Sequence, residues 1–170
     1  PVPLLLSQAQ GPGPWATLSV RAAVPLTAPR FAGYRIARQV EVVQRRVAGR
    51  LSRGDVLKVR LTVEAQAERN WVVVSDPVPA GATIVGDLGG QSAQLAAQAG
   101  GGTRASYVER GQEAWRGYFQ WLPAGTTVLD YAVRLNGAGD FAMPPTRVEA
   151  MYSPAIRAAL PNARLVVGAR

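Results

Sequence analysis

The chain has 170 residues, of which 48% are hydrophobic and 18% are charged. This length suits one domain, or one domain with a short piece of a neighbour. The absence of Cys and His excludes disulfides, Ser-His-Asp and Cys-His catalysis, and nearly every known form of zinc site. We therefore expect a binding or structural module of a larger protein, without a cofactor or metal, that is not an enzyme in its own right.

The formal net charge is +8, and Lys58 is the one lysine among the basic residues. A basic chain can indicate a nucleic-acid partner or an acidic surface. The arginines are scattered, however, and the densest group (Arg45, Arg46, Arg50 and Arg53) contains no aromatic residue. Modules that bind nucleic acid usually combine basic and aromatic residues on one element, so we expect no nucleic-acid partner.

The sequence contains no apolar run of the roughly 20 residues that a membrane-spanning helix needs. The first residues show no signal-peptide pattern. We expect the chain to be a piece of a larger protein, with any export signal upstream of Pro1.

In chain order, residues 1–14 are rich in Pro, Gly and Gln and predict a linker. Residues 15–24 and 34–43 predict strands, because apolar and polar side chains alternate in both. Pro25 and Pro29 lie between them and break the first strand.

The clearest element covers residues 56–64. Leu57, Val59, Leu61 and Val63 alternate with polar side chains, which predicts a half-buried strand of an antiparallel sheet. The preceding residues 52–55 predict a turn. They contain Arg53-Gly54-Asp55, the integrin-binding tripeptide, but Gly-Asp before a strand is ordinary turn chemistry.

The remaining chain predicts further short strands and two helical pieces. Strands are expected at residues 71–74, 114–122, 126–135, 148–152 and 165–167, a short Ala-rich helix at 91–98, and a helical turn at 154–160. Many short strands without a βαβ rhythm predict an all-β, antiparallel β-sandwich with a short helical insertion.

Three acidic residues, Glu109, Glu113 and Asp130, are the candidates for acid–base chemistry of the kind that glycosidases use. Solvated carboxylates, or carboxylates paired with the abundant arginines, are the favoured alternative. The glycine-rich residues 100–104 resemble a phosphate-binding loop, but their spacing fits neither a P-loop nor a dinucleotide fingerprint.

The aromatic residues Trp115, Tyr118, Phe119 and Trp121 form the candidate sugar-stacking group. Such residues more often divide between the core and cross-strand pairs. An extracytoplasmic adhesion or carbohydrate-binding module is therefore the alternative function.

Several segments resemble a known family in the right order and spacing. They are GDVLKVRL at residues 54–61, WVVVSDPVPAGA at 71–82, Leu135-Asn136, Phe141 and PPTRVEAMY at 144–152. Residues 31–170 resemble the C-terminal macroglobulin-type domain of bacterial α2-macroglobulins. Residues 1–30 resemble a linker and the terminal strand of the preceding CUB-like domain.

The resemblance implies an immunoglobulin-like, macroglobulin-type sandwich in a monomeric protein that traps and inhibits proteases and helps bacteria evade host defence. These proteins are generally periplasmic and often lipid-anchored. Protease cleavage of a bait region triggers a rearrangement, and members with a Cys-x-Glu-Gln thioester then couple to the protease. The partners implied are the neighbouring thioester and CUB-like domains and, through the full-length protein, target proteases.

One site follows from the resemblance. A loop near the C-terminus of this domain covers the thioester with an apolar side chain, and the matching segment is residues 149–154, with Met151 as the best candidate for the cover and Tyr152 beside it. We expect these two residues to form the shielding loop. The alternative is that one of them belongs to the sandwich core.

Overall fold

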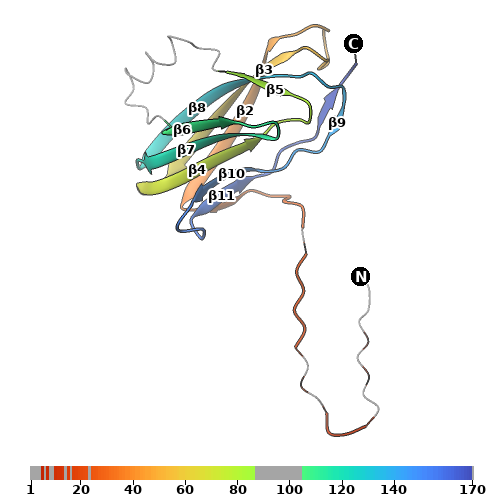
Figure 1. The fold of residues 1–170 in the computed structure, drawn as a ribbon, viewed down its shortest axis with the longest axis vertical. Coiled ribbons are helices and arrows are strands. Elements are labelled where there is room, and N and C mark those ends of the chain that lie inside the picture. The colour runs from red at the N-terminus through yellow and green to blue at the C-terminus, as the bar shows by residue number, and fades with distance from the viewer. Residues whose placement is uncertain are drawn as a thin grey trace.

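The computed structural model describes residues 5, 7, 10–13, 15, 17–22, 24–86 and 105–169. Twelve β-strands and no helix are found among these residues (Figure 1). The strands are β1 (Arg30–Ala32), β2 (Tyr34–Gln44), β3 (Val56–Ala65), β4 (Arg69–Pro77), β5 (Thr83–Gly86), β6 (Tyr107–Arg110), β7 (Ala114–Leu122), β8 (Gly125–Arg134), β9 (Gly139–Phe141), β10 (Thr146–Ala150), β11 (Arg157–Leu160) and β12 (Leu165–Val167).

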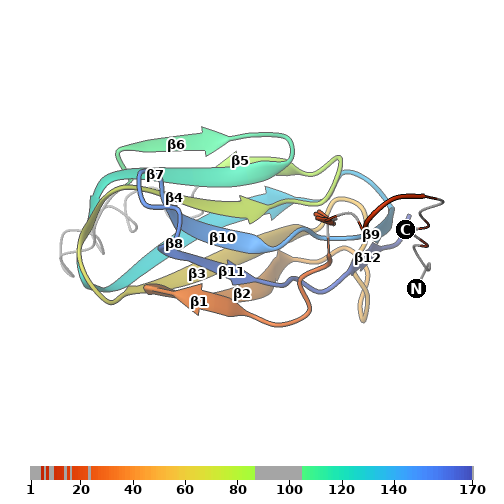
Figure 2. The same ribbon diagram turned by 90° about the horizontal axis from the view of Figure 1, so that it is seen from below.

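Two sheets form the sandwich. One has the strand order β1-β11-β10-β4-β7-β6 and the other has the order β2-β3-β8-β5. Figure 2 shows the first sheet running from β6 to β1 in front of β3 and β8. The pairings between named strands are all antiparallel, including the small β12–β9 pair. The predicted antiparallel all-β class is confirmed.

The alternation along β3 is confirmed residue by residue. Leu57, Val59, Leu61 and Val63 are at most 4% exposed, whereas Arg60 lies on the outer face. The pleat of a strand turns successive side chains to opposite faces, so one face of β3 supplies the centre of the core. Burial of these branched aliphatic side chains contributes about 1.5–3 kcal/mol each.

The facing sheet contributes aromatic rings to the same core. Trp115 on β7 stacks on Tyr131 of β8, with ring centroids 5.2 Å apart and planes 5° from parallel. Gly117 makes room beside the indole, because a Cβ there would lie 2.7 Å from Trp115 Cη2. The two sheets therefore contact each other through stacked aromatic rings as well as through aliphatic side chains.

A buried carboxylate connects the sheets. Asp76 on β4 is fully buried and accepts hydrogen bonds from Arg38 Nε on β2, at 3.0 Å to each oxygen. The hydroxyls of Tyr131 on β8 and Thr146 on β10 also donate to it. Side chains from four strands, two in each sheet, thus form one hydrogen-bonded group. Its hydrogen bonds and ion pair offset the free-energy cost of burying the Asp76 carboxylate.

The chain changes sheet between β1 and β2. Gly33 joins them at φ 83°, and a Cβ there would lie 2.7 Å from Ile156 Cγ2. Glycine adopts this left-handed backbone without steric cost. Strand β1 therefore pairs with β11 in one sheet while β2 pairs with β3 in the other.

Two sequence predictions are wrong. The described part of residues 15–24 forms no strand, and Leu18 and Val20 are 67% and 75% exposed, since no other described segment lies alongside to complete a ladder. Residues 154–160 contain no helical turn. Instead, Arg157–Leu160 form β11, whose backbone pairs with β1 on one side and β10 on the other.

The predicted strands at residues 114–122 and 165–167 have the bounds of β7 and β12, and the other five are present with shifted ends. Four further short strands (β1, β5, β6 and β9) were not predicted. Strand β10 ends at Ala150, so Met151 and Tyr152 follow it in a turn. The predicted helix at residues 91–98 and the glycine-rich residues 100–104 lie outside the described residues.

Candidate functional site

The turn between β10 and β11 carries the predicted shielding residues. The Met151 N–H donates to the Trp71 carbonyl at 2.8 Å, and the Ser153 N–H donates to the Ala150 carbonyl at 2.9 Å. Farther along, the Ile156 N–H donates to Ser153 at 2.8 Å. These backbone bonds tie the turn to β4 and fix the direction in which its side chains project.

Both predicted residues are exposed. Met151 is 46% exposed and Tyr152 is 77% exposed. Neither side chain belongs to the core, which removes the alternative that one of them is ordinary sandwich packing. An exposed apolar pair on a tightly bonded turn suits a surface that another domain covers.

Trp71 completes the surface from the neighbouring strand. Its indole is 46% exposed and meets the Tyr152 ring edge to face, with centroids 6.3 Å apart and planes at 89°. Trp71, Met151 and Tyr152 are called the end patch below. Sequence reasoning missed Trp71 as a site residue, because it belongs to a strand remote in sequence and only pairing of β4 with β10 brings it here.

The backbone of Trp71 is strained. Its φ of 57° is the one positive value among the described non-glycine residues. The ladder with β7 pairs Asn70 with Trp121 and Val72 with Phe119, but omits Trp71. A left-handed conformation costs a non-glycine residue about 1–2 kcal/mol. Such strain often accompanies functional surfaces. Here the Trp71 indole lies beside the Tyr152 ring, and the Trp71 carbonyl accepts the hydrogen bond from the Met151 N–H.

Chemically, the end patch can cover a group and exclude water from it. It contains two aromatic rings and a flexible thioether, which adapts to irregular pockets. It contains no carboxylate, amine or imidazole, so its three side chains offer no acid–base pair.

The three candidate carboxylates do not form one site. Glu109 and Glu113 share Arg116, whose Nη1 and Nη2 lie 2.7 Å and 3.0 Å from them. Asp130 lies in the other sheet, where Arg60 binds both of its oxygens at 2.8 Å. The Arg60 hydrogen bond outweighs partial burial and holds the pKa of Asp130 below its ordinary value. These residues therefore show the arginine pairing that was the favoured alternative.

The Arg53-Gly54-Asp55 tripeptide does not present its carboxylate. Asp55 is fully buried, and its oxygens accept bonds from the Ser52 and Arg46 N–H groups at 3.0 Å and 2.7 Å. Burial alone would raise the pKa of Asp55, but these backbone bonds, the Ser52 hydroxyl and nearby Arg45 lower it below the ordinary value. The tripeptide forms a turn cap and not an adhesion loop.

The aromatic group is divided. Trp115 and Phe119 are buried at 4% and 1% exposure, whereas Trp121 is 49% exposed. Tyr118 is half-buried on the outer face, 5.9 Å from Tyr107, and its hydroxyl donates to Glu109 at 2.9 Å. That hydrogen bond raises the pKa of Tyr118, with burial adding to the shift. The four residues do not make one stacking platform.

The described residues contain no cluster of three or more side chains suited to hold a metal ion. They also include no helix with the length and hydrophobicity to cross a membrane.

The geometry thus defines a class: an antiparallel β-sandwich with an exposed apolar turn that packs against a strained residue of β4. Residues 33–155 match the family described as the Bacterial Alpha-2-macroglobulin MG10 domain. The chain belongs to this family. No curated protein matches it.

Solved structures agree on the fold. The native α2-macroglobulin of Escherichia coli from domain MG7 to the C-terminus is similar at a TM-score of 0.70 and 20% identity, covering 85% of this chain and 25% of that one. Salmonella α2-macroglobulin reacted with methylamine gives 0.68 and 24%, covering 82% and 9%. The E. coli protein activated by porcine elastase gives 0.69 and 21%, covering 83% and 14%.

At most a quarter of the length of these chains is therefore matched. The matched part of each is one domain among the others of a longer α2-macroglobulin chain. The similarity extends the immunoglobulin-like macroglobulin fold to this protein.

Proposed function

We propose that the chain is a non-catalytic domain of a protease-trapping α2-macroglobulin that packs against a thioester domain and keeps its thioester shielded before activation. The observation that carries the proposal is the end patch. Met151 and Tyr152 project from a turn whose backbone is bonded to β4, and the Trp71 ring supports Tyr152 at 6.3 Å. The two predicted residues are therefore exposed and held in place.

The chemistry of a thioester explains why such a surface is useful. A thioester survives only while water and amines are kept from its carbonyl carbon. An apolar cover excludes both, and a side chain held by backbone bonds and a ring contact loses little further freedom when it docks. The patch brings no general base that would assist hydrolysis.

The solved relatives add support of a limited kind. One is described as reacted with methylamine, and another as activated by porcine elastase. We extend this reactivity to the protein that contains the present chain, and propose that target proteases are met by that protein as a whole. We also propose a periplasmic, lipid-anchored location, which cell fractionation of the full-length protein tests.

The experiment uses the full-length protein and follows thioester loss in methylamine. Met151→Ala and Tyr152→Ala should each speed inactivation several-fold, because each opens part of the cover. Val128→Ala is the matched control, since Val128 is 52% exposed on β8, outside the patch, and should leave the rate unchanged. Rates equal to wild type in both patch variants would overturn the shielding role.

A further inference from the structure

Strand β2 offers an unpaired edge. It is the terminal strand of the four-stranded sheet, and among the residues that the structure describes it pairs with β3 on one side only. The sandwich is also incompletely closed there, because Val40 follows the inward alternation of Tyr34 and Ile36 yet is 43% exposed, while those two are nearly buried. The backbone and the inner face of β2 are therefore both accessible in its second half.

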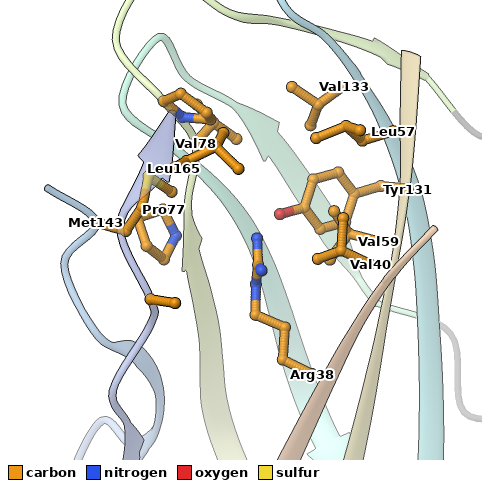
Figure 3. A pocket seen from close by; sticks show the side chains of 12 residues that line it. Arg38, Val40, Leu57, Val59, Pro77, Val78, Tyr131, Val133, Met143 and Leu165 are labelled. Carbon is orange, nitrogen blue, oxygen red and sulfur yellow. The ribbon is translucent and has the colours of Figure 1, made fainter. Parts of the chain in front are cut away.

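An apolar cleft opens beside this edge. Its empty volume is about 370 Å³, including space open to solvent. Val40, Val59, Tyr131, Val78, Met143 and Leu165 are among the residues that line it. Figure 3 shows Val40, Val59 and Tyr131 on one side of the cleft, with Pro77 and Met143 on the other. The lining is suited to one apolar side chain.

The guanidinium of Arg38 adds polarity to this cleft. Its Nε–H donates to both carboxylate oxygens of Asp76 at 3.0 Å, and the guanidinium lies near the Tyr131 hydroxyl. Its two terminal NH2 groups carry more donors than one hydroxyl can accept, and the side chain keeps 17% exposure. In Figure 3 the guanidinium reaches into the middle of the cleft. It can donate to a carboxylate or a carbonyl of an occupant.

The surroundings of the edge are basic. Arg35, Arg45 and Arg46 are exposed on β2 or directly after it, against the single acidic residue Glu41 on that strand. Because Asp76 already neutralises Arg38 and Asp55 lies near Arg45, this excess positive charge comes mainly from Arg35 and Arg46. An acidic partner is electrostatically complementary to it.

We propose that the β2 edge and its cleft bind an extended acidic peptide segment, which adds a strand to β2 and inserts an apolar side chain beside Arg38. Strand addition provides main-chain hydrogen bonds, while a pocket at the edge selects alternate side chains. The geometry supplies both features at one place. The site is separate from the end patch and is independent of any thioester.

The test measures fluorescence anisotropy of a labelled peptide of about eight residues in which aspartate alternates with leucine, a length typical of strands. It is titrated with the full chain at low salt. The expected result is saturable binding that weakens at least tenfold when lysine replaces aspartate or glycine replaces leucine. Absence of saturable binding at millimolar concentrations, or equal binding of the lysine peptide, would overturn the proposal.

A matched pair of variants locates the site. Val40→Glu places a carboxylate at the mouth of the cleft and should weaken binding at least tenfold. Gln39→Glu adds the same charge one residue away on the outer face and should change the affinity only about twofold. Equal effects of the two variants would show general charge repulsion and would overturn the assignment of the peptide site to the cleft.

Free acetate and isovalerate at millimolar concentrations should compete poorly with the peptide, because they lack the backbone of a strand. Full competition by either would assign the site to small carboxylates instead.

Discussion

Trp71 and Tyr152 lie 81 positions apart in the sequence, counted as 152 minus 71, and meet edge to face with ring centroids 6.3 Å apart. The contact depends on an unusual backbone, because Trp71 has φ 57° and leaves the ladder between β4 and β7. The strained residue of β4 thus packs against the exposed ring of Tyr152 in the turn after β10.

The first prediction concerns this strain. Trp71→Gly and Trp71→Ala both lose the ring contact, but glycine accepts a positive φ and alanine does not. The glycine variant should be more stable than the alanine variant by about 1 kcal/mol. Urea unfolding measures the difference. At Val73, a regular position on the same strand, the alanine variant should be the more stable of the two. If alanine is more stable than glycine at position 71 as well, Trp71 is unstrained.

The second prediction compares two buried tyrosines. The Tyr131 hydroxyl donates to Asp76, whereas the Tyr34 hydroxyl has no hydrogen-bond partner among the described residues. Tyr131→Phe removes a bond to a charged group and should cost about 1.5–3 kcal/mol, while Tyr34→Phe should be neutral or stabilising. Thermal and urea unfolding of both variants check this. Equal losses would contradict the assignment of partners.

The third prediction compares a buried carboxylate with an exposed one. Asp76 is fully buried and has Arg38 as its ionic partner, whereas Asp130 is about one-third exposed beside Arg60. Asp76→Asn leaves Arg38 uncompensated and should cost about 3–5 kcal/mol. Asp130→Asn should cost less than about 1 kcal/mol. The comparison fails if the exposed pair proves as costly as the buried one in denaturant unfolding.

The fourth prediction concerns acid. Hydrogen bonds from Ser52 and Arg46 overcome burial and lower the pKa of Asp55 below its ordinary 3.8. A lowered pKa in the folded state gives stability that is present above the unfolded pKa and is lost as pH falls through the folded value. The free energy of unfolding of the wild type should therefore be larger than that of Asp55→Asn by about 1–3 kcal/mol at pH 7.

Below about pH 3.8 this difference should shrink, because a protonated Asp55 resembles the asparagine that replaces it. Urea unfolding of both proteins across the acid range measures the difference. A constant difference over that range would show that the charge of Asp55 contributes nothing.

Period-two patterns made much of the fold predictable. The alternation through β3 identified its buried face without any knowledge of partners, since a strand with one solvent-exposed face must alternate. The segments from residue 54 to residue 152 also identified the family, which the match over residues 33–155 establishes. These features are local, so a single sequence reports them.

Short strands were less predictable. Strand β11 has four residues, and its pattern was mistaken for a helical turn because its pairing with β1 and β10 is remote in sequence. Residues 15–24 show the opposite error: they have the alternation of a strand, but the described ones lack a neighbouring backbone. A strand requires a ladder, and ladders depend on tertiary structure.

The sequence by itself determined the class, the strand faces of the central core and the absence of imidazole and thiol chemistry, because composition and pleat are properties of the chain. Only the tertiary structure decided that Met151 and Tyr152 are both exposed, that Trp71 supports them, and that Arg38 reaches into an open cleft. Each of these depends on which strands lie side by side. That arrangement is set by packing and hydrogen bonding between segments far apart in the sequence.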